Sequence, residues 1–203
     1  MRVTGGRLRG KPVAATKGRS IRPTADRVRE SLFNILAHGR VATAHGAALE
    51  GARVLDAFAG TGALGLEALS RGAAHVTFID NAPAAQRILA QNIALCGVED
   101  ASELLRADAA NPPPARQPAD IAFLDPPYGA GLLVPALDGL RRLGWFHERS
   151  LIVAELGARE KIVWPEFAEE LDARRYGAAR IVFLRISGST ASATGAKSSP
   201  LMI

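Results

Sequence analysis

The fold is decided by the stretch Val54-Leu-Asp-Ala-Phe-Ala-Gly-Thr-Gly-Ala-Leu-Gly65, where a short apolar run enters a glycine-rich turn and then a helix-forming segment. Glycines at such a junction let the backbone turn tightly and approach a ligand, at which the amino end of the helix points. The spacing Gly60-x-Gly62-x-x-Gly65 also matches the dinucleotide-binding fingerprint. Taken alone, the loop fits a nicotinamide dinucleotide as well as the methionine part of S-adenosylmethionine.

Apolar runs alternate with helical segments on both sides of this stretch. A strand–helix alternation of this kind indicates a parallel sheet with helices on both faces. We therefore predict an α/β, Rossmann-like fold whose mostly parallel sheet of seven strands ends in an antiparallel pair. The expected strands include 54–55, 76–79, 104–105, 121–124 and 151–153, with helices at 63–71, 82–96 and 130–143 and a final pair at 174–176 and 179–186 turning at Gly177.

The chain is expected to divide into four parts. Residues 1–37 form a small basic extension, with a β-hairpin turning at Gly5-Gly6 and a helix whose N-cap is Thr24. Residues 38–51 are rich in Ala and Gly and are expected to be a linker. The main domain covers 52–186, and the Ser/Thr-rich tail at 187–203 is predicted to be disordered.

Composition excludes several classes of protein. The single cysteine, Cys96, rules out a disulfide framework and a Cys-based zinc cluster, and the four histidines show no ligand spacing, so we predict no metal. Cys96 is expected on the buried side of its helix. No apolar stretch is long enough to cross a membrane and no signal peptide is present, so we expect a cytoplasmic protein with no membrane partner.

The positive charge is concentrated at the amino-terminal end. Residues 1–30 carry nine basic and two acidic side chains, an excess of seven, whereas the whole chain has a net charge of +5. The remainder is therefore slightly acidic. A basic end beside a neutral body favours contact with a polyanion such as a nucleic acid.

Four aspartates fall where predicted strands end. In an open α/β sheet, ligands bind at the carboxyl ends of the strands. Asp56 precedes the glycine loop, where a carboxylate would repel a pyrophosphate but attract a sulfonium and an ammonium group. Asp80 is placed to hold ribose hydroxyls, Asp108 to accept from an adenine amino group, and Asp125 to act on the other reactant.

The tetrapeptide Asp125-Pro126-Pro127-Tyr128 closes the apolar run at 121–124. The prolines stiffen the turn and leave its carbonyls free to accept, and Asp125 adds an acceptor carboxylate. Tyr128 offers a face on which a planar ring can stack. Such a corner suits an exocyclic amine on a nucleobase, although the same residues also occur in ordinary loops.

Four stretches carry a resemblance to a known family: Arg22-Pro-Thr-Ala-Asp-Arg-Val-Arg-Glu-Ser-Leu-Phe-Asn-Ile-Leu36, 54–73, Asp125-Pro-Pro-Tyr128 and Arg175-Tyr-Gly177. They resemble class I S-adenosylmethionine-dependent methyltransferases that act on exocyclic amines. The match is closer to the RsmD type, the bacterial guanine-N2 methyltransferases of small-subunit ribosomal RNA. The first stretch is the most specific, because the other motifs are shared more widely.

The resemblance implies a role for each set of residues. It implies S-adenosyl-L-methionine as cofactor, guanine 966 of 16S ribosomal RNA as the family's target, and that RNA or the small ribosomal subunit as partner, with no stable protein partner. The catalytic residues would be Asp125, Pro126, Pro127 and Tyr128. The cofactor-binding residues would be Asp56, Phe58, Ala59, Gly60, Thr61, Gly62, Gly65, Asp80, Asn81, Asp108 and Ala109. The RNA-binding residues would be Arg7, Arg9, Lys11, Arg19, Arg22, Thr24, Arg27 and Arg29.

Three other functions remain open on the sequence. A DNA adenine-N6 methyltransferase would share the Asp-Pro-Pro-Tyr corner, so only the amino-terminal stretch favours RNA guanine. A catalytically silent RNA-binding module would keep the basic end. A nicotinamide-dependent oxidoreductase would use the loop at 60–65, and Asp56 argues against it.

Overall fold

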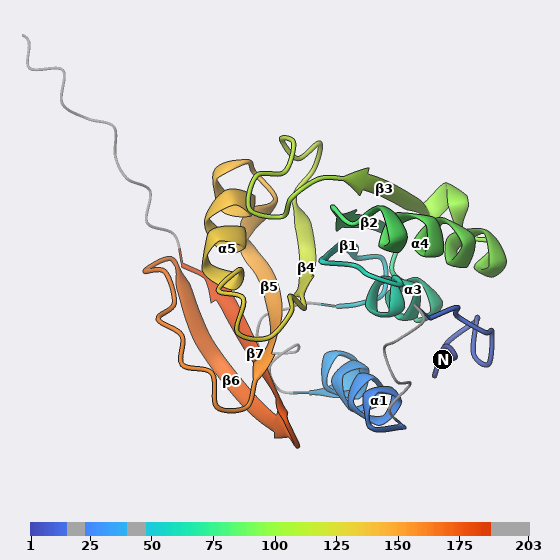
Figure 1. Cartoon of the computed structure of the whole chain (residues 1–203), viewed down its shortest axis with the longest axis horizontal. Helices are drawn as coiled ribbons and strands as arrows, with labels where there is room; N and C mark the ends of the chain where they lie inside the picture. Colours follow the sequence, from blue (N-terminus) through green and yellow to red (C-terminus); the bar gives the residue numbers. More distant parts are fainter. Residues whose placement is uncertain (16–22, 40–47, 188–203) are drawn as a thin grey trace, which may run out of the picture.

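The computed structural model describes residues 1–15, 23–39 and 48–187. Its centre is one sheet of seven strands in the order β3-β2-β1-β4-β5-β7-β6 (Figure 1). The five strands from β3 to β5 are parallel, and β7 pairs antiparallel with both β5 and β6. The predicted fold class is confirmed. The strands are β1 (Arg53–Ala57), β2 (His75–Asp80), β3 (Ser102–Arg106), β4 (Ala119–Leu124), β5 (Phe146–Gly157), β6 (Ala168–Tyr176) and β7 (Ala179–Ile186).

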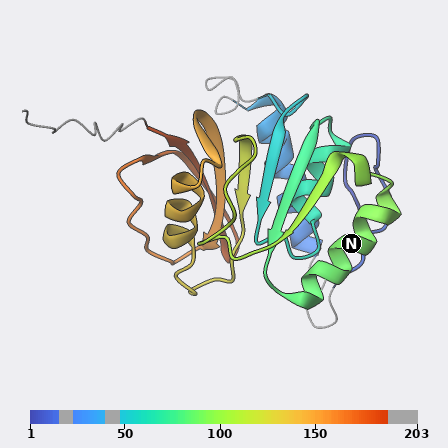
Figure 2. The same cartoon turned by 90° about the horizontal axis from the view of Figure 1, so that it is seen from above.

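Helices cover both faces of the sheet, and Figure 2 shows α5 and α1 on opposite sides of the strands. Alternate residues of a strand point to opposite faces, so each strand feeds two cores. Val54 and Phe78 pack with α1, α3 and α4, whereas Leu55 and Ile79 pack with α5. The helices are α1 (Pro23–His38), α3 (Ala63–Ser70), α4 (Pro83–Cys96), the short 3₁₀ helix η1 (Glu99–Ala101) and α5 (Leu133–Arg142).

Helix α1 starts two residues earlier than expected. Its first residue is Pro23, and proline is favoured at the first position of a helix, so Thr24 lies inside the first turn and is not the N-cap. One face of the helix is apolar, and its Leu32, Phe33 and Leu36 are buried. Cys96 is also buried, as expected, and burial raises the pKa of its thiol.

The amino-terminal segment pairs with itself at a different place from the one predicted. Its two arms meet at an isolated bridge between Arg2 and Pro12, and the turn runs over residues 5–10. The expectation of a turn at Gly5-Gly6 was therefore wrong in position. A Cβ at Gly6 would lie 1.8 Å from the Ser70 carbonyl oxygen, so this glycine permits close approach to α3 instead.

The same segment is packed into the main core. Val3, Leu8 and Val13 are buried in the core that α1 shares with the sheet. It is also fixed by Glu67 of α3, which is fully buried. The Glu67 carboxylate accepts from the Thr4 amide at 2.8 Å, the Thr4 hydroxyl at 2.7 Å and the Gly5 amide at 2.8 Å. The described residues 1–15 are thus an integral part of the α3 face.

Among the described residues, no helix is long and apolar enough to cross a membrane. Within the same ranges, no group of three or more His, Cys, Asp or Glu side chains is arranged to hold a metal ion. Part of the predicted linker lies outside the described ranges, and so does the whole tail after Ser187.

Candidate active site at the carboxyl edge of the sheet

The four aspartates lie along one edge of the sheet, as predicted. Asp56 is the last residue but one of β1, Asp80 ends β2, and Asp125 directly follows β4. Asp108 lies two residues beyond β3. Because β3, β2, β1 and β4 are neighbours and parallel, their carboxyl ends meet at the same edge.

Asp56 is the most unusual of these groups. Its side chain is only 2% exposed, and one carboxylate oxygen accepts from the Gly65 amide at 2.9 Å. Burial raises the pKa of Asp56 to about 8, and the negative charges of Asp125 and Asp80 add to the rise. No lysine or arginine of the described ranges forms an ion pair with it. A cationic ligand at this edge would supply the missing positive charge.

The glycine loop has an unusual backbone. Phe58 is the one described residue other than glycine with a positive φ, at 64°, and Gly60 follows at 56°. Such a conformation in a non-glycine residue is strained and is typical of ligand-binding turns. A Cβ built on Gly60 would have no neighbour closer than 3.9 Å, so open space faces the backbone there. This is where a ligand can approach.

The other two glycines have a packing role. A Cβ at Gly62 would lie 2.3 Å from the Leu89 side chain, and one at Gly65 would lie 2.2 Å from the Phe78 ring. Both therefore let α3 sit close against α4 and β2. Of the predicted cofactor-binding glycines, only Gly60 faces open space.

Asp80 joins the loop to β2. Its carboxylate accepts from the Gly60 amide at 2.8 Å and from the Ala82 amide at 2.8 Å. Each carboxylate oxygen has two acceptor positions, so capacity remains for a ligand. The neighbouring Asn81 is exposed.

Asp108 makes a local turn. Its carboxylate accepts from the Ala110 amide at 2.9 Å, and the side chain is exposed, while Ala109 is buried. The structure thus brings Asp108 to the correct edge and leaves it accessible.

Asn92 of α4 was missed by the sequence reasoning. It is fully buried and donates to the Thr61 carbonyl of the glycine loop at 2.9 Å. It also donates to the Ala14 carbonyl at 3.1 Å and accepts from the Ala14 amide at 2.8 Å. A polar residue on the apolar face of a predicted helix was the signal available in the sequence.

The Asp-Pro-Pro-Tyr corner follows β4 at the same edge. Asp125 is half-buried, Pro126 is buried and Pro127 is exposed. Tyr128 is 49% exposed, and its hydroxyl donates to the Glu155 carboxylate. The ring is therefore accessible to a ligand while its far end is anchored.

Glu160 supports this corner and was also missed. Its carboxylate accepts from the Gly129 amide and the Gly157 amide, each at 3.2 Å. One side chain thus ties the end of the corner to the end of β5. Glu155 and Glu160 belong to no recognised motif. The register of β5 beside β4 places Glu155, and Glu160 lies in the turn after β5.

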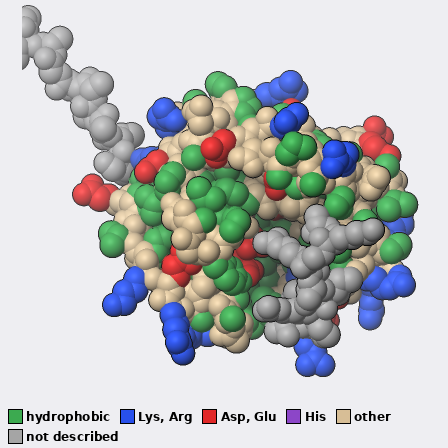
Figure 3. Space-filling view, viewed as in Figure 1, with side chains coloured by type: hydrophobic (Ala, Val, Ile, Leu, Met, Phe, Trp, Pro, Cys, Tyr) green, Lys and Arg blue, Asp and Glu red, His purple; other side chains and the backbone are tan. Residues whose placement is uncertain are grey.

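The predicted RNA-binding residues have different surroundings. Arg7, Arg9 and Arg27 are exposed. Lys11 is exposed too, and its ammonium donates to the Cys96 carbonyl at 2.8 Å. Figure 3 shows Lys and Arg side chains mainly around the rim of the face that Figure 1 presents. The structure does not describe the side chains of Arg19, Arg22 and Thr24.

Arg29 requires a correction. It is only 6% exposed, and its guanidinium donates to the Arg2 carbonyl at 2.6 Å and to the Asp26 carboxylate at 3.0 Å. It also contacts Glu67 at 3.4 Å. The expectation that it binds RNA is wrong, because these partners fix its guanidinium inside the protein. Arg29 instead holds the amino-terminal segment to α1 and α3.

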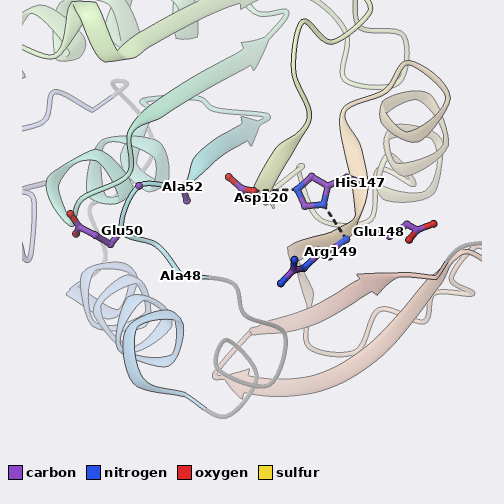
Figure 4. A pocket seen from close by; sticks show the side chains of 8 residues that line it. Ala48, Glu50, Ala52, Asp120, His147, Glu148 and Arg149 are labelled. Atoms are coloured by element: carbon purple, nitrogen blue, oxygen red, sulfur yellow. Dashed lines mark hydrogen bonds and ion pairs between the residues drawn. The ribbon is translucent and has the colours of Figure 1, made fainter.

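A separate hollow of about 770 Å³ lies at the opposite edge of the sheet. Its lining includes Asp120 near the start of β4 and His147 near the start of β5, with the His147 ring 3.2 Å from the Asp120 carboxylate (Figure 4). Since these are the amino ends of parallel strands, the hollow is distant from the four aspartates and forms no part of this site.

Comparison with known proteins identifies relatives of this chain. The family model described as Conserved hypothetical protein 95 matches residues 1–185. The chain is 37% identical to Ribosomal RNA small subunit methyltransferase D of Escherichia coli over 155 residues, covering 76% of this chain and 74% of that protein. It is 32% identical to the Haemophilus influenzae protein of the same name over 170 residues, covering 82% and 83%.

A solved structure has the same fold as this chain. The Escherichia coli protein yhhF superimposes with a TM-score of 0.76 at 31% identity, covering 92% of this chain and 97% of that one. The family model and these relatives together cover most of the described chain. The chain belongs to the family described as Conserved hypothetical protein 95, the RsmD methyltransferase family.

Proposed function

We propose that this methyltransferase transfers a methyl group from S-adenosyl-L-methionine to N2 of a guanine in the RNA of the small ribosomal subunit, with guanine 966 of 16S ribosomal RNA as the expected target. The observation that carries the proposal is the single edge of the sheet that holds both the Asp56–Gly60–Asp80 group and the Asp125–Tyr128 corner. The names of the relatives supply the class of substrate.

The residues at this edge fit the cofactor. When bound, S-adenosylmethionine supplies an electrophilic methyl group on a positively charged sulfur. Asp56 would balance that charge and the cofactor's ammonium group, and Gly60 would let the cofactor approach the backbone. Asp80 has acceptor capacity for ribose hydroxyls and Asp108 for an adenine amine. An anionic pyrophosphate would be repelled by Asp80 and would gain no ion pair from Asp56, which disfavours a nicotinamide dinucleotide.

The corner residues would act on the amine. The lone pair of a guanine N2 amine is delocalised into the ring, so the amine is a weak nucleophile. Asp125 and the Pro126 carbonyl would accept its two hydrogens and direct the lone pair at the methyl group. Tyr128 would hold the base by stacking on its accessible face. Catalysis of this kind rests on positioning and electrostatics. The target base must leave its stack, so an unpaired nucleotide is the expected substrate.

The experiment is a product analysis. The protein is incubated with S-adenosylmethionine carrying a labelled methyl group and, in parallel, with 16S ribosomal RNA, small subunits and adenine-rich DNA. We expect label in N2-methylguanosine from the RNA or the subunits. Label in N6-methyl-2′-deoxyadenosine from the DNA would support a DNA enzyme, and RNA binding without transfer would support a silent module. Titration with NADH and with S-adenosylhomocysteine separates the two cofactor classes.

Asp56 gives a prediction on cofactor binding. At pH 7 a carboxyl with a pKa of about 8 is mostly protonated, and a bound cation would drive the proton off. Wild-type protein should therefore release a proton on binding S-adenosylmethionine. Asp56→Asn should release none and bind roughly tenfold or more weakly. Calorimetry in two buffers of different ionisation enthalpy measures both quantities.

The same variant also tests whether the buried charge of Asp56 destabilises the folded protein. Because the folded-state pKa of Asp56 exceeds its ordinary 3.8, the native protein binds the extra proton and loses stability as pH rises from about 4 to 8. Asp56→Asn removes this loss, so at pH 9 it should melt about 5 °C or more above wild type, with a smaller difference at pH 5. Equal melting temperatures at pH 9 would contradict a buried, destabilising charge.

The basic turn gives a prediction on RNA binding. Deleting the whole amino-terminal segment would also remove Val3, Leu8 and Val13 from the core, so point substitutions are cleaner. Arg7→Gln with Arg9→Gln should weaken RNA binding and reduce the slope of log affinity against log salt by about 1–2. Arg149→Gln, a substitution in the hollow beside His147, is the matched control and should leave the slope unchanged. An unaltered slope in the double variant would remove Arg7 and Arg9 from the interface.

A further inference from the structure

Glu155 and Asp125 come from neighbouring strands at the reactive edge. The paired register of the parallel strands β4 and β5 ends with Leu124 opposite Ala154, and Asp125 and Glu155 are the residues that directly follow this last pair. The Tyr128 hydroxyl, three residues after Asp125, donates to the Glu155 carboxylate, which brings Glu155 to the Asp125–Tyr128 corner. We therefore infer that two acceptor carboxylates face the place where the target base is expected.

Tyr128 fixes Glu155 relative to the base. Its hydroxyl donates to one Glu155 oxygen, while its ring is accessible for stacking. A base that stacks on this ring would bring one edge toward Glu155. A carboxylate offers about four acceptor positions, so the bond to Tyr128 leaves capacity for a ligand. The backbone of Glu155 is held between β4 and β7, where it pairs with Ile181.

The two purines differ in what they present to such a pair. Guanine carries an N1–H donor directly beside its N2 amine, so two neighbouring carboxylates can accept from both. Adenine has an unprotonated N1 beside its N6 amine, and that lone pair would face a carboxylate that can only accept. A base that places its lone pair against an acceptor is strongly disfavoured relative to one that donates there.

We propose that Glu155 determines the purine specificity of the reaction by accepting the N1–H of the target guanine, while Asp125 accepts from the N2 amine. The inference rests on the proposed function and adds the residue that selects guanine. It also gives a physical reason why an Asp-Pro-Pro-Tyr corner can serve guanine in one protein and adenine in another, according to the neighbouring strand.

A purely structural role for Glu155 makes a different prediction. If Glu155 only anchored the Tyr128 ring, its loss would slow methylation of every purine alike. A specificity role changes the ratio between two bases. The ratio of kcat/KM values for two substrates therefore separates the two roles.

The test uses 2-aminopurine, which keeps the 2-amine but has an unprotonated N1. The methylated nucleotide is first mapped with wild-type protein, and an RNA is then made with 2-aminopurine at that position. Wild type should prefer the guanine RNA by about 100-fold in kcat/KM. In Glu155→Gln the side chain can donate as well as accept, so the preference should fall to within about fivefold.

Glu160→Gln is the matched control, because the Glu160 carboxylate supports the same corner by accepting from the Gly129 and Gly157 amides. It should change the rates for both RNAs by the same factor and leave their ratio at the wild-type value. A wild-type ratio in Glu155→Gln, or an equal loss with both bases, would overturn the proposal. If wild type forms no N2-methylguanosine at all, the proposed function fails instead, and the two failures are distinct.

Discussion

Replacement of Asp125 by alanine is expected to lower the turnover of methyl transfer by about 10³-fold or more, with the dissociation constant for S-adenosylmethionine within a few-fold of wild type. Asp125 is half-buried at the end of β4, one strand away from the cofactor-binding group on β1 and β2. Its loss removes the acceptor that would aim the amine, but not the groups that would hold the cofactor. Single-turnover transfer and calorimetric binding measure the two effects separately.

Asp125→Asn is the graded control for this prediction. The amide keeps one acceptor oxygen and the shape of the side chain, so its turnover should lie between those of the wild type and the alanine variant. Removing the charge of Asp125 should also lower the pKa of Asp56, because the two carboxylates repel each other. Turnover by Asp125→Ala at the wild-type rate would exclude Asp125 from the reaction.

Replacement of Glu67 by alanine should reduce the free energy of unfolding by about 3–5 kcal/mol, the largest effect on stability expected in the chain. The fully buried carboxylate pairs with Arg71 at 2.8 Å and with Arg29 at 3.4 Å, and it accepts from Thr4 and Gly5. Without it, buried donors lose their acceptor. Urea unfolding measures the loss, and hydrogen exchange at residues 3–13 should show that this segment opens first.

Acid should reproduce part of this effect. Burial alone would raise the pKa of Glu67, but hydrogen bonds from Thr4 and Arg71 and the charge of Arg71 hold the pKa below its ordinary 4.5. The stabilisation is thus present above pH 4.5 and is lost as pH falls through the lowered pKa. Glu67→Gln should remove this part of the acid dependence. Wild-type stability in Glu67→Ala would contradict the role of this carboxylate.

The parallel strands could be predicted because a strand buried on both faces is a continuous apolar run. The glycine loop and Asp125 mark two of their ends, which fixes the edge of the site. Strand β6 was found only at 174–176, since its sequence AEELDARRY is charged and lies at the edge of the sheet. A half-exposed edge strand carries too little apolar pattern to show its length.

The side chains that support the site could not be predicted in the same way. Arg29 looked like a surface charge, and only its packing against Glu67 shows that it is internal. Glu155 acquires its position from the register of β5 beside β4, and Asn92 from the docking of Ala14 on α4. Such contacts join residues that are tens of positions apart, so no local motif contains them.

The most direct test of the whole account is a crystal structure of the protein with S-adenosylhomocysteine. We predict that the ligand lies over Gly60, with its amino group near Asp56, its ribose hydroxyls on Asp80 and its sulfur facing the Asp125–Tyr128 corner. A ligand bound at the opposite edge, in the hollow beside His147, or one whose sulfur points away from the two prolines, would contradict it.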